Sequence, residues 1–351
     1  MNTQTLIIYG ATGYSGRLIV QQAVARGLRP VVAGRDERAV ATMAARSGLK
    51  WAIARVEEPA SLRAMMASGT VLLNAAGPFS TTAIPLLEAC LSTGAHYLDI
   101  TGIAGSIEPV AARSQEAVHR GVMLMPAVGF EVVASDCLLA HVARRLPSAT
   151  LLRLGFDKSD PTSSGSIKTT VEMAGLGVPV RRDGELTRVP PGSLVWYFDY
   201  GRGLQASFAV ELADLGTAHF STGIPNVETY MRASPAVWSS TVSNQYWGWL
   251  LATPFWQSFL KMHVDRFTPD PSLRDRSAGW GVLVAEASEA TGRYVRSRLR
   301  TGDVYLFTAL SAIGVVERVL AGEWSPGFQT PSHMYGPDFA LSFEGAMRED
   351  L

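Results

Sequence analysis

The sequence predicts an α/β protein with a Rossmann-type, doubly wound parallel sheet, followed by a second, α+β domain with a mixed or antiparallel sheet. Three observations support this fold class. Apolar residues 6–9 lead into a turn with glycines at positions 10, 13 and 16, and a helix-compatible segment follows. Short apolar strands then alternate with helical segments as far as residue 126. Beyond residue 129, helices give way to short β-prone runs separated by turns.

The length of 351 residues favours two domains, and a hydrophobic content of 47% is enough for sizeable cores. We expect a dinucleotide-binding domain over residues 1–129 and an α+β substrate or dimerisation domain over residues 130–300. Residues 301–351 are expected to form a C-terminal helix and tail that pack back on the first domain.

The bulk properties argue against several classes of protein. A formal net charge of zero and the absence of a basic run give no sign of nucleic-acid binding. Cys90 and Cys137 lie apart in apolar segments, so no disulfide framework is expected. The six histidines show no ligand spacing, and we expect no metal. The chain runs directly into its first strand without room for a signal peptide, which predicts a cytoplasmic protein.

The glycine turn has the order of elements that a pyrophosphate requires. Gly10 permits the tight turn, Gly13 lets the backbone approach the phosphates, and Gly16 lets the helix over residues 18–26 pack close to the strand. This turn predicts dinucleotide binding, and the residues expected to contact the cofactor are Gly10, Thr12, Gly13, Tyr14, Ser15 and Gly16.

The second strand, residues 30–33, ends where a Rossmann domain contacts the adenosine ribose. An acidic residue there binds the 2′-hydroxyl of NAD, whereas an arginine accommodates the 2′-phosphate of NADP. Arg35 precedes Asp36 in this chain, which favours NADP(H). We expect Asp36 to point to solvent or to cap the next helix.

The rest of the first domain alternates regularly. Helices are expected at 38–46, 61–67, 83–93 and 107–120, and strands at 51–54, 70–74, 96–100 and 122–126. Small residues after the strand over 70–74 would let the second ribose and the nicotinamide lie against the backbone. We therefore add five residues to the predicted cofactor site: Asn74, Ala75, Ala76, Gly77 and Pro78.

The second domain is expected to contain helices at 134–146 and 166–176 with a loop over 161–165 between them. Strands are expected at 151–156, 281–287 and 292–300, with shorter β-prone runs at 195–200, 207–211 and 218–220. A long apolar helix is expected at 303–321.

Residues 233–260 contain no charged side chain in 28 positions but seven aromatic ones. Pro254, Gly248 and several polar residues interrupt the run, so it does not fit a transmembrane helix. The favoured interpretation is a mostly buried helix pair at a domain or dimer interface. The alternatives are the wall of a hydrophobic substrate site and, less favoured, a membrane-surface contact.

Several sequence blocks together resemble the saccharopine-dehydrogenase-like oxidoreductases, in particular the branch with the trans-acting enoyl reductases. The resemblance extends over nearly the whole chain. Two positions depart from the family pattern: Ile103 stands where the family usually has glutamate, and Glu131 where it usually has aspartate. The blocks are Gly10-Ala-Thr-Gly-Tyr-Ser-Gly16, Ala33-Gly-Arg35, Asn74-Ala-Ala-Gly-Pro-Phe79, His96-Tyr-Leu-Asp-Ile-Thr-Gly102, Gly129-Phe130, Ser135-Asp136, Ile224-Pro-Asn226, Asp270-Pro-Ser-Leu-Arg274, Asp303-Val-Tyr305, Ala321-Gly322 and Thr330-Pro-Ser332.

A nicotinamide would carry the hydride, and the protein would have to supply a proton. No tyrosine is followed four residues later by lysine, which excludes the proton donor of short-chain dehydrogenases. The favoured candidates are Tyr97, Asp99 and Thr101 after one strand, and Glu131 and Asp136 after the next. Lys168 and His219 are weaker candidates, because they are single polar residues with no partner visible in the sequence. Asp99 and Thr101 equally fit a loop held by backbone hydrogen bonds, and Asp136 equally fits a helix cap.

The leading function is an NADPH-dependent reductase of an activated C=C bond in a hydrophobic acyl or polyketide-like substrate, which could be carrier- or CoA-linked. A second hypothesis is an imine or amino-acid reductase, which needs arginines to hold substrate carboxylates. A third is an NADP-binding scaffold without turnover. A homodimer is compatible with all three. The candidate carboxylate-binding residues are Arg153, Arg181, Arg182, Arg188, Arg202 and Arg232.

Overall fold

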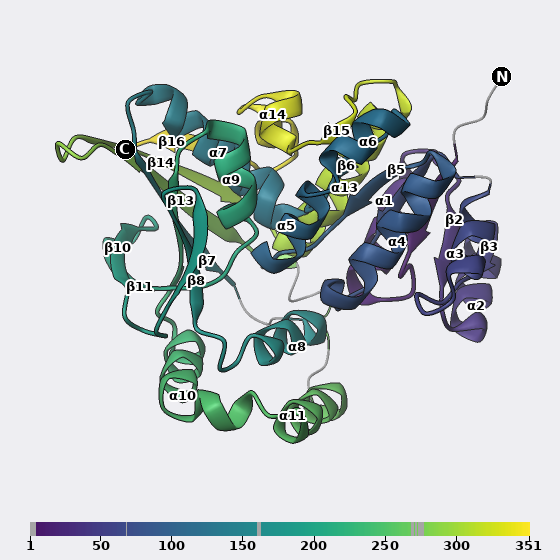
Figure 1. Ribbon diagram of the computed structural model, residues 1–351, viewed down its shortest axis with the longest axis horizontal. Coiled ribbons are helices and arrows are strands. Elements are labelled where there is room, and N and C mark those ends of the chain that lie inside the picture. Colours follow the sequence, from purple (N-terminus) through teal and green to yellow (C-terminus); the bar gives the residue numbers. More distant parts are fainter. Residues whose placement is uncertain (1–4, 68, 160–162, 268–269, 271, 273–276) are drawn as a thin grey trace. The chain divides into compact units, whose positions relative to one another are not determined.

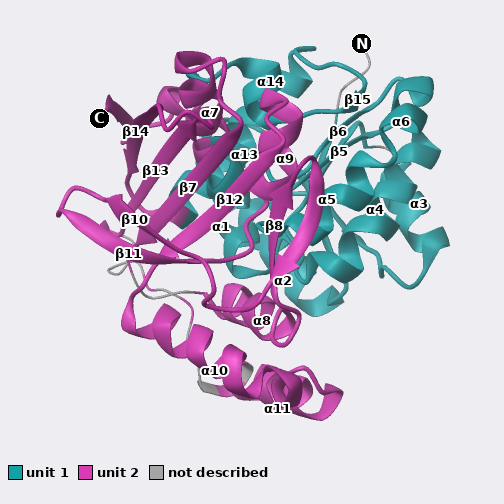
Figure 2. Cartoon of the chain, turned by 60° about the vertical axis from the view of Figure 1, so that its left-hand side comes forward, with its two compact units in different colours: residues 1–133, 305–339 teal, residues 134–304, 340–351 magenta. Residues whose placement is uncertain are grey.

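The computed structural model describes residues 5–67, 69–159, 163–267, 270, 272 and 277–351. The chain divides into two compact units, which Figure 2 shows in different colours. Unit 1 comprises residues 1–133 and 305–339, and unit 2 comprises residues 134–304 and 340–351. The segment 301–351 is thus shared between the units. The predicted loop at 161–165 and the block at 270–274 lie partly outside the described residues.

Unit 1 contains a parallel sheet, sheet A, with seven strands among the described residues in the order β15-β6-β5-β4-β1-β2-β3. Every residue of β1, β2, β4 and β5 is buried, as expected for strands covered on both faces. The strand order reverses beside β1, between β2 and β4, which makes this the topological switch point. The strands are β1 (Leu6–Tyr9), β2 (Val31–Gly34), β3 (Trp51–Ile53), β4 (Val71–Asn74), β5 (His96–Asp99), β6 (Met123–Met125) and β15 (Gly327–Phe328).

Helices flank sheet A (Figure 1). Their starts follow ordinary capping chemistry: the Asp36 carboxylate accepts a hydrogen bond from the backbone of Ala39, and proline occupies the first turn of α3. The helices are α1 (Tyr14–Ala25), α2 (Glu37–Ser47), α3 (Pro59–Met66), α4 (Phe79–Thr93), α5 (Ala104–Ala111), α6 (Ser114–Arg120), α13 (Val304–Leu320) and α14 (Pro331–Tyr335).

Unit 2 contains a mixed sheet, sheet B, with nine strands among the described residues. Its main path is β10-β11-β12-β7-β13-β14-β16, and β8 pairs with β12 and β9. The β12–β7 pair is parallel, whereas the other pairs are antiparallel. The strands are β7 (Leu151–Lys158), β8 (Val178–Arg182), β9 (Glu185–Val189), β10 (Val195–Asp199), β11 (Leu204–Ala209), β12 (Asn226–Arg232), β13 (Gly281–Ser288), β14 (Tyr294–Thr301) and β16 (Met347–Asp350). The predicted fold class is therefore confirmed in both parts.

Three local predictions for the second half of the chain are wrong. Residues 218–220 belong to helix α9 rather than to a β-prone run, and the helix expected from residue 134 starts at Phe130. Residues 233–260 do form a helix pair, but it is not mostly buried within the chain: Trp249 is 72% exposed and Phe255 73%. The helices are α7 (Phe130–Arg145), α8 (Ser164–Glu172), α9 (Asp214–Thr222), α10 (Pro235–Leu251), α11 (Pro254–Phe267) and the 3₁₀ helix η1 (Phe339–Ser342).

Candidate cofactor and active site

The turn after β1 is shaped by two glycines. Gly10 has a φ of +77°, and a Cβ on it would lie 2.6 Å from the backbone nitrogen of Ala76. A Cβ on Gly16 would overlap the carbonyl oxygen of Gly10. These two positions therefore need glycine for the backbone conformation and for close packing of α1 on the turn.

Gly13 differs from these two because a Cβ there would press against the neighbouring backbone without overlapping it. It precedes α1 in an extended conformation, and a Cβ there would meet only the Gly10 carbonyl oxygen, at 3.3 Å. The first N–H groups of a helix have no partner within the helix and favour an anion. Arg17 donates a hydrogen bond to the carbonyl of Thr12 (2.8 Å) and so steadies the turn. The geometry fits a pyrophosphate at the start of α1.

Arg35 and Asp36 follow β2 directly. The Asp36 carboxylate caps α2, with 3.0 Å between its Oδ1 and the Ala39 nitrogen, as expected from the sequence. Arg35 is exposed. The Arg35 guanidinium is therefore exposed at the end of β2, whereas the Asp36 carboxylate is engaged at the start of α2. This arrangement suits a ribose 2′-phosphate.

The loop after β4 is held by a buried side-chain network. Oδ1 of Asn74 accepts a hydrogen bond from the backbone of Ala76 (2.9 Å), and its Nδ2 donates to Oγ1 of Thr82 (3.2 Å). The Thr82 hydroxyl donates to the carbonyl of Ala76 (2.6 Å), and the Gly77–Pro78 peptide is cis. Asn74 thus fixes the backbone of Ala75, Ala76 and Gly77, beside the glycine turn.

Tyr97 and Asp99 are fully buried and bond to each other. The Tyr97 hydroxyl donates to Oδ2 of Asp99 (2.7 Å), whose Oδ1 accepts from the backbones of Thr101 (2.9 Å) and Ala127 (2.8 Å). Burial raises the pKa of both side chains, well above the usual value for Tyr97. The Asp99 carboxylate therefore ties the end of β5 to the segment that follows β6.

The segments that follow the Asp99 hydrogen bonds contain Thr101, Gly102 and Glu131. The Thr101 side chain is 2% exposed, and its hydroxyl has no hydrogen-bond partner among the described residues. Glu131 is half-buried in the first turn of α7. A Cβ on Gly102 would overlap Oε2 of Glu131, so this carboxylate rests on the bare Cα of Gly102.

The first turn of α7 is anchored within unit 1. The Phe130 backbone donates to Oγ1 of Thr308 on α13 (3.1 Å), and the rings of Phe130 and Phe307 meet edge to face at 5.5 Å. Glu131 is thus carried by a fixed helix start.

Sheet register explains why several predicted residues meet. Tyr9 pairs with Asn74, and Asn74 with Asp99, so β1, β4 and β5 end level with one another. The turns that follow these strands stand side by side at the switch point, where open α/β sheets bind ligands.

Asp136, unlike the other candidates, belongs to unit 2. It is fully buried and accepts a hydrogen bond from the Ser221 hydroxyl (2.7 Å). The cap alternative for Asp136 is wrong, because α7 starts six residues earlier, at Phe130. Sequence reasoning missed Gly102 as a site residue, although Thr-Gly directly after a buried strand was a signal.

The described residues offer neither a metal site nor a membrane span. No group of histidine, cysteine, aspartate or glutamate side chains there is arranged to hold a metal ion. Within the same residues, no helix has the length and apolar character needed to cross a membrane.

Comparison with known proteins places this geometry in a family context. Residues 6–125 match the model of the saccharopine dehydrogenase NADP-binding domain. The chain is 30% identical over 148 residues to a trans-acting enoyl reductase of Mycobacterium tuberculosis and 31% identical over 148 residues to that of Mycobacterium ulcerans. Each match covers 40% of this chain and 35% of the relative, so the chain spans about a third of the relatives' length.

A solved structure covers more of the chain. The saccharopine dehydrogenase (L-Glu forming) of Saccharomyces cerevisiae aligns with 99% of this chain and 100% of its own, with a TM-score of 0.64 and 12% identity, a likeness of fold. The resemblance predicted from the sequence is confirmed, as is NADP(H) as the cofactor of the matched domain family. The matched domain thus supports NADP(H) binding by residues 6–125.

Proposed function

We propose that this protein is an NADPH-dependent reductase of an activated C=C bond in a hydrophobic acyl or polyketide-like substrate, carrier- or CoA-linked. The names of the enoyl reductase relatives favour this reaction. The structural observation that supports it over imine or amino-acid reduction concerns the arginines of unit 2. Each of the six arginines nominated from the sequence to hold a substrate carboxylate already has a partner within that unit.

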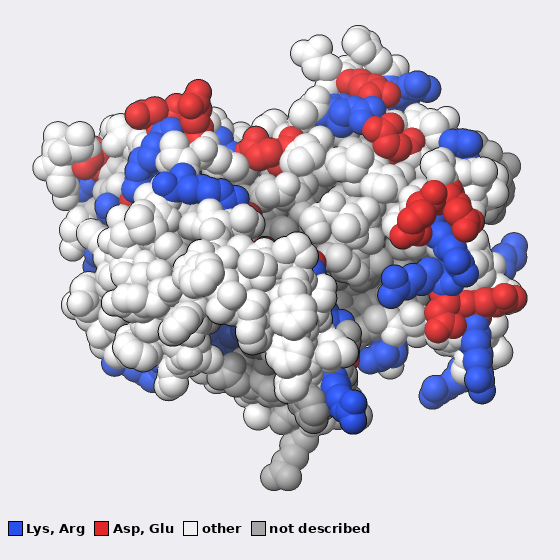
Figure 3. Space-filling model, turned by 60° about the horizontal axis from the view of Figure 1, so that its bottom comes forward, with Lys and Arg blue, Asp and Glu red and all other residues white. Residues whose placement is uncertain are grey.

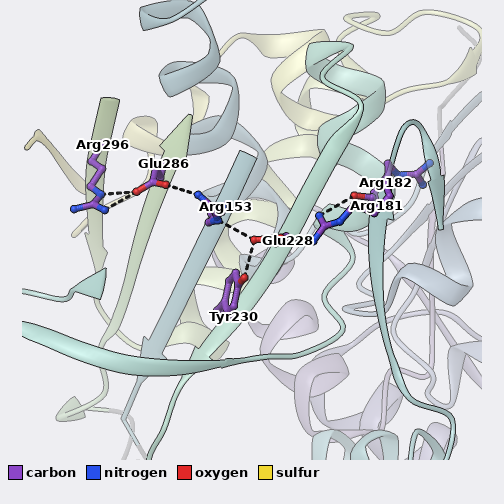
Figure 4. Close-up of polar contacts among 7 residues, drawn as sticks. All are labelled: Arg153, Arg181, Arg182, Glu228, Tyr230, Glu286 and Arg296. Atoms are coloured by element: carbon purple, nitrogen blue, oxygen red, sulfur yellow. Dashed lines mark hydrogen bonds and ion pairs between the residues drawn. The ribbon is translucent and has the colours of Figure 1, made fainter. Parts of the chain in front are cut away.

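Three of these arginines belong to the network in Figure 4. Arg153 bonds to Glu228 and to Glu286, at 2.8 Å each, and Arg182 pairs with Glu228 as well. Arg181 is buried and donates to the carbonyls of Leu215 and Gly184. The two glutamates are almost fully buried, so removing their cationic partners would leave uncompensated charges.

The remaining arginines are engaged in the same way. Arg202 and Arg232 both pair with the buried Asp157, at 2.9 and 2.7 Å. Arg188 donates to the carbonyls of Leu176 and Gly177, at 3.0 Å each. A dicarboxylic substrate would have to displace these internal partners, whereas a neutral enoyl substrate would not. The arrangement therefore favours the neutral substrate.

NADPH, when bound, would supply the hydride to the β-carbon of the double bond. In this proposal the turn with Gly10, Gly13 and Gly16 holds the pyrophosphate, and Arg35 the 2′-phosphate. Thr12, Tyr14 and Ser15 complete the turn, and the loop from Asn74 to Pro78 lies along the second ribose and nicotinamide.

Among the candidate proton donors, we assign the role to Glu131. Tyr97 and Asp99 are fully buried and occupied with each other and with the backbone. Glu131 is partly exposed on a fixed helix start, so its carboxyl can exchange protons with solvent and deliver one to the α-carbon. The buried Thr101 hydroxyl would donate a hydrogen bond to the bound ligands.

The decisive experiment follows NADPH absorbance with two kinds of acceptor. One is a medium-chain 2-enoyl thioester, and the other is an imine formed from an amino acid and a 2-oxo acid. We expect oxidation of NADPH with the thioester only. Turnover of the carboxylated imine alone would establish the second hypothesis. NADPH binding without turnover of either acceptor would favour a scaffold.

A further inference from the structure

Helices α10 and α11 present seven large apolar side chains to solvent, which we call the aromatic surface. Their exposed fractions range from 39% to 73%. Figure 3 shows the face that carries these helices as a broad area without acidic or basic side chains. The residues of the aromatic surface are Trp238, Tyr246, Trp247 and Trp249 on α10 and Phe255, Phe259 and Met262 on α11.

On α10, the side at Gly248 packs against the rest of unit 2, and the aromatic residues lie around the remainder of the helix. Among the α10 residues, all of which are described, Gly248 alone is buried. It lies against Gly175, whose N–H donates to Oδ1 of Asn244 (2.7 Å). At about 100° per residue, Tyr246 and Trp247 project well away from this packed side. The aromatic side chains are therefore not directed into the unit's own core.

On α11, the exposed apolar residues form a stripe. Phe255, Phe259 and Met262 recur at positions i, i+4 and i+7, which places them on one face of the helix. Trp256 packs edge to face against Phe255 and Phe259, at 5.8 and 5.6 Å between ring centroids, and so stiffens the stripe.

The exposed apolar area is close to what one side of a standard interface buries. An aromatic side chain contributes about 150–250 Å², so the observed fractions leave on the order of 700 Å² of apolar surface exposed. The largest apolar patch on a typical monomer is about 300–600 Å². A standard protein interface buries about 800 Å² per partner. The aromatic surface thus approaches what one side of a dimer contributes.

We propose that a second copy of this chain covers the aromatic surface, with α10 and α11 packing against the same helices of the partner around a twofold axis. A twofold interface sets a patch against itself, so a patch of one charge would repel its copy. Residues 233–260 carry no charge, and the adjacent Lys261 is neutralised by Glu172 at 2.7 Å. The surface therefore carries no charge that would repel a second copy.

The same composition argues against a lipid surface. Helices that lie in a membrane interface carry a polar face rich in lysine and arginine. Residues 233–260 contain neither residue, and the two basic residues of α11, Lys261 and Arg266, lie in its C-terminal half. The proposal does not depend on the reaction catalysed.

The test measures the mass of the full-length protein in solution over a dilution series, by light scattering coupled to gel filtration. We expect a dimer for the wild type. In the variant Trp249→Glu/Phe255→Glu, both changed side chains are more than 70% exposed, so the fold is retained while the dimer dissociation constant rises at least a hundredfold. The control Trp51→Glu changes a tryptophan that is 44% exposed on β3, and should leave the mass unchanged.

Circular dichroism verifies that both variants are folded. A monomeric wild type over the whole series would overturn the proposal, as would a dimer that survives the double substitution. Sedimentation with phosphatidylcholine–phosphatidylglycerol vesicles distinguishes the competing occupant. A monomer that binds vesicles through Trp249 and Phe255 would replace the second copy by a lipid surface.

Discussion

Glu131 rests on the bare Cα of Gly102, and this contact links the two segments that follow β5 and β6. Gly102 does not have a positive φ, so its backbone conformation does not require glycine. Glycine is required there because a Cβ would overlap the neighbouring Glu131 carboxylate. The position of the Glu131 carboxylate, the proposed proton donor, therefore depends on the lack of a side chain at Gly102.

We predict that Gly102→Ala reduces kcat by at least tenfold and leaves NADPH affinity almost unchanged, because the new methyl group displaces the Glu131 carboxylate. In a Glu131→Ala background the same substitution should have little further effect. Steady-state kinetics of the four proteins, arranged as a double-mutant cycle, measure this coupling. Additive losses would mean that Gly102 acts independently of Glu131.

A second prediction for a single residue concerns the cofactor preference set by Arg35. A charge-assisted hydrogen bond contributes about 1.5–3 kcal/mol, which corresponds to roughly ten- to a hundredfold in affinity. Arg35→Ala should weaken NADP by that factor and leave NAD nearly unchanged, because only NADP carries the 2′-phosphate. Isothermal titration of both cofactors distinguishes this from a loop defect, which would weaken both equally. A wild-type preference for NAD would contradict the assignment.

At the scale of secondary-structure elements, the strand β16 closes the edge of sheet B through ion pairs. Glu349 pairs with Arg298 (2.7 Å), and Asp350 contacts His141 (2.9 Å) and Arg145 (3.1 Å). Hydrogen bonds from Arg298 and from His141 lower the pKa of Glu349 and of Asp350 respectively. The paired carboxylates thus favour the docked strand only while they are ionised.

We predict that β16 loosens in acid. A carboxylate with a lowered folded-state pKa stabilises the fold above its unfolded pKa, near 4, and the stabilisation is lost as pH falls through the folded pKa. Amide exchange of residues 347–350 should therefore accelerate between about pH 5 and pH 3, relative to the intrinsic rate. The variant Glu349→Gln/Asp350→Asn should exchange rapidly at both pH values, and equal pH dependence in variant and wild type would exclude this cause.

The elements that could be predicted from sequence are those with a strong apolar run. β1, β4 and β5 are buried throughout, and their predicted bounds agree with the structure within a residue. β15 was missed because two residues carry no periodicity, and its pairing is set by Met123 and Leu124 far away in the chain. In α9, the short run Ala218-His219-Phe220 suggested a strand, whereas helix formation buries Leu215 and Ala218 together.

In the candidate site, too, only features with a local sequence signal could be predicted. Motifs indicated Gly10, Gly13, Arg35 and Asn74 because their local spacing carries the chemistry. Contacts made across strands, such as that between Asp99 and Ala127, have no local signal. The engagement of the unit 2 arginines, which bears on the substrate class, also depends on strand register, since Arg153 stands opposite both Glu228 and Glu286.

For the molecule as a whole, folding and cofactor binding are coupled by mass action. A ligand that binds only the folded state stabilises it by RT ln(1 + [L]/Kd), which is about 2.7 kcal/mol at a hundredfold excess over Kd. Saturating NADPH should therefore raise the thermal unfolding temperature of the wild type. The glycine turn offers two substitutions that separate stability from binding.

Gly13→Val should unfold at nearly the wild-type temperature without NADPH but show no NADPH-dependent increase. The extended conformation of Gly13 accommodates valine, and a Cβ there meets only the Gly10 carbonyl oxygen at 3.3 Å, so the side chain fills the pyrophosphate space rather than the core. Gly16→Val should lower the unfolding temperature even without NADPH, because its Cβ overlaps that carbonyl oxygen. Differential scanning fluorimetry at several NADPH concentrations separates the two effects. A normal NADPH-dependent shift in folded Gly13→Val would place the pyrophosphate away from this turn.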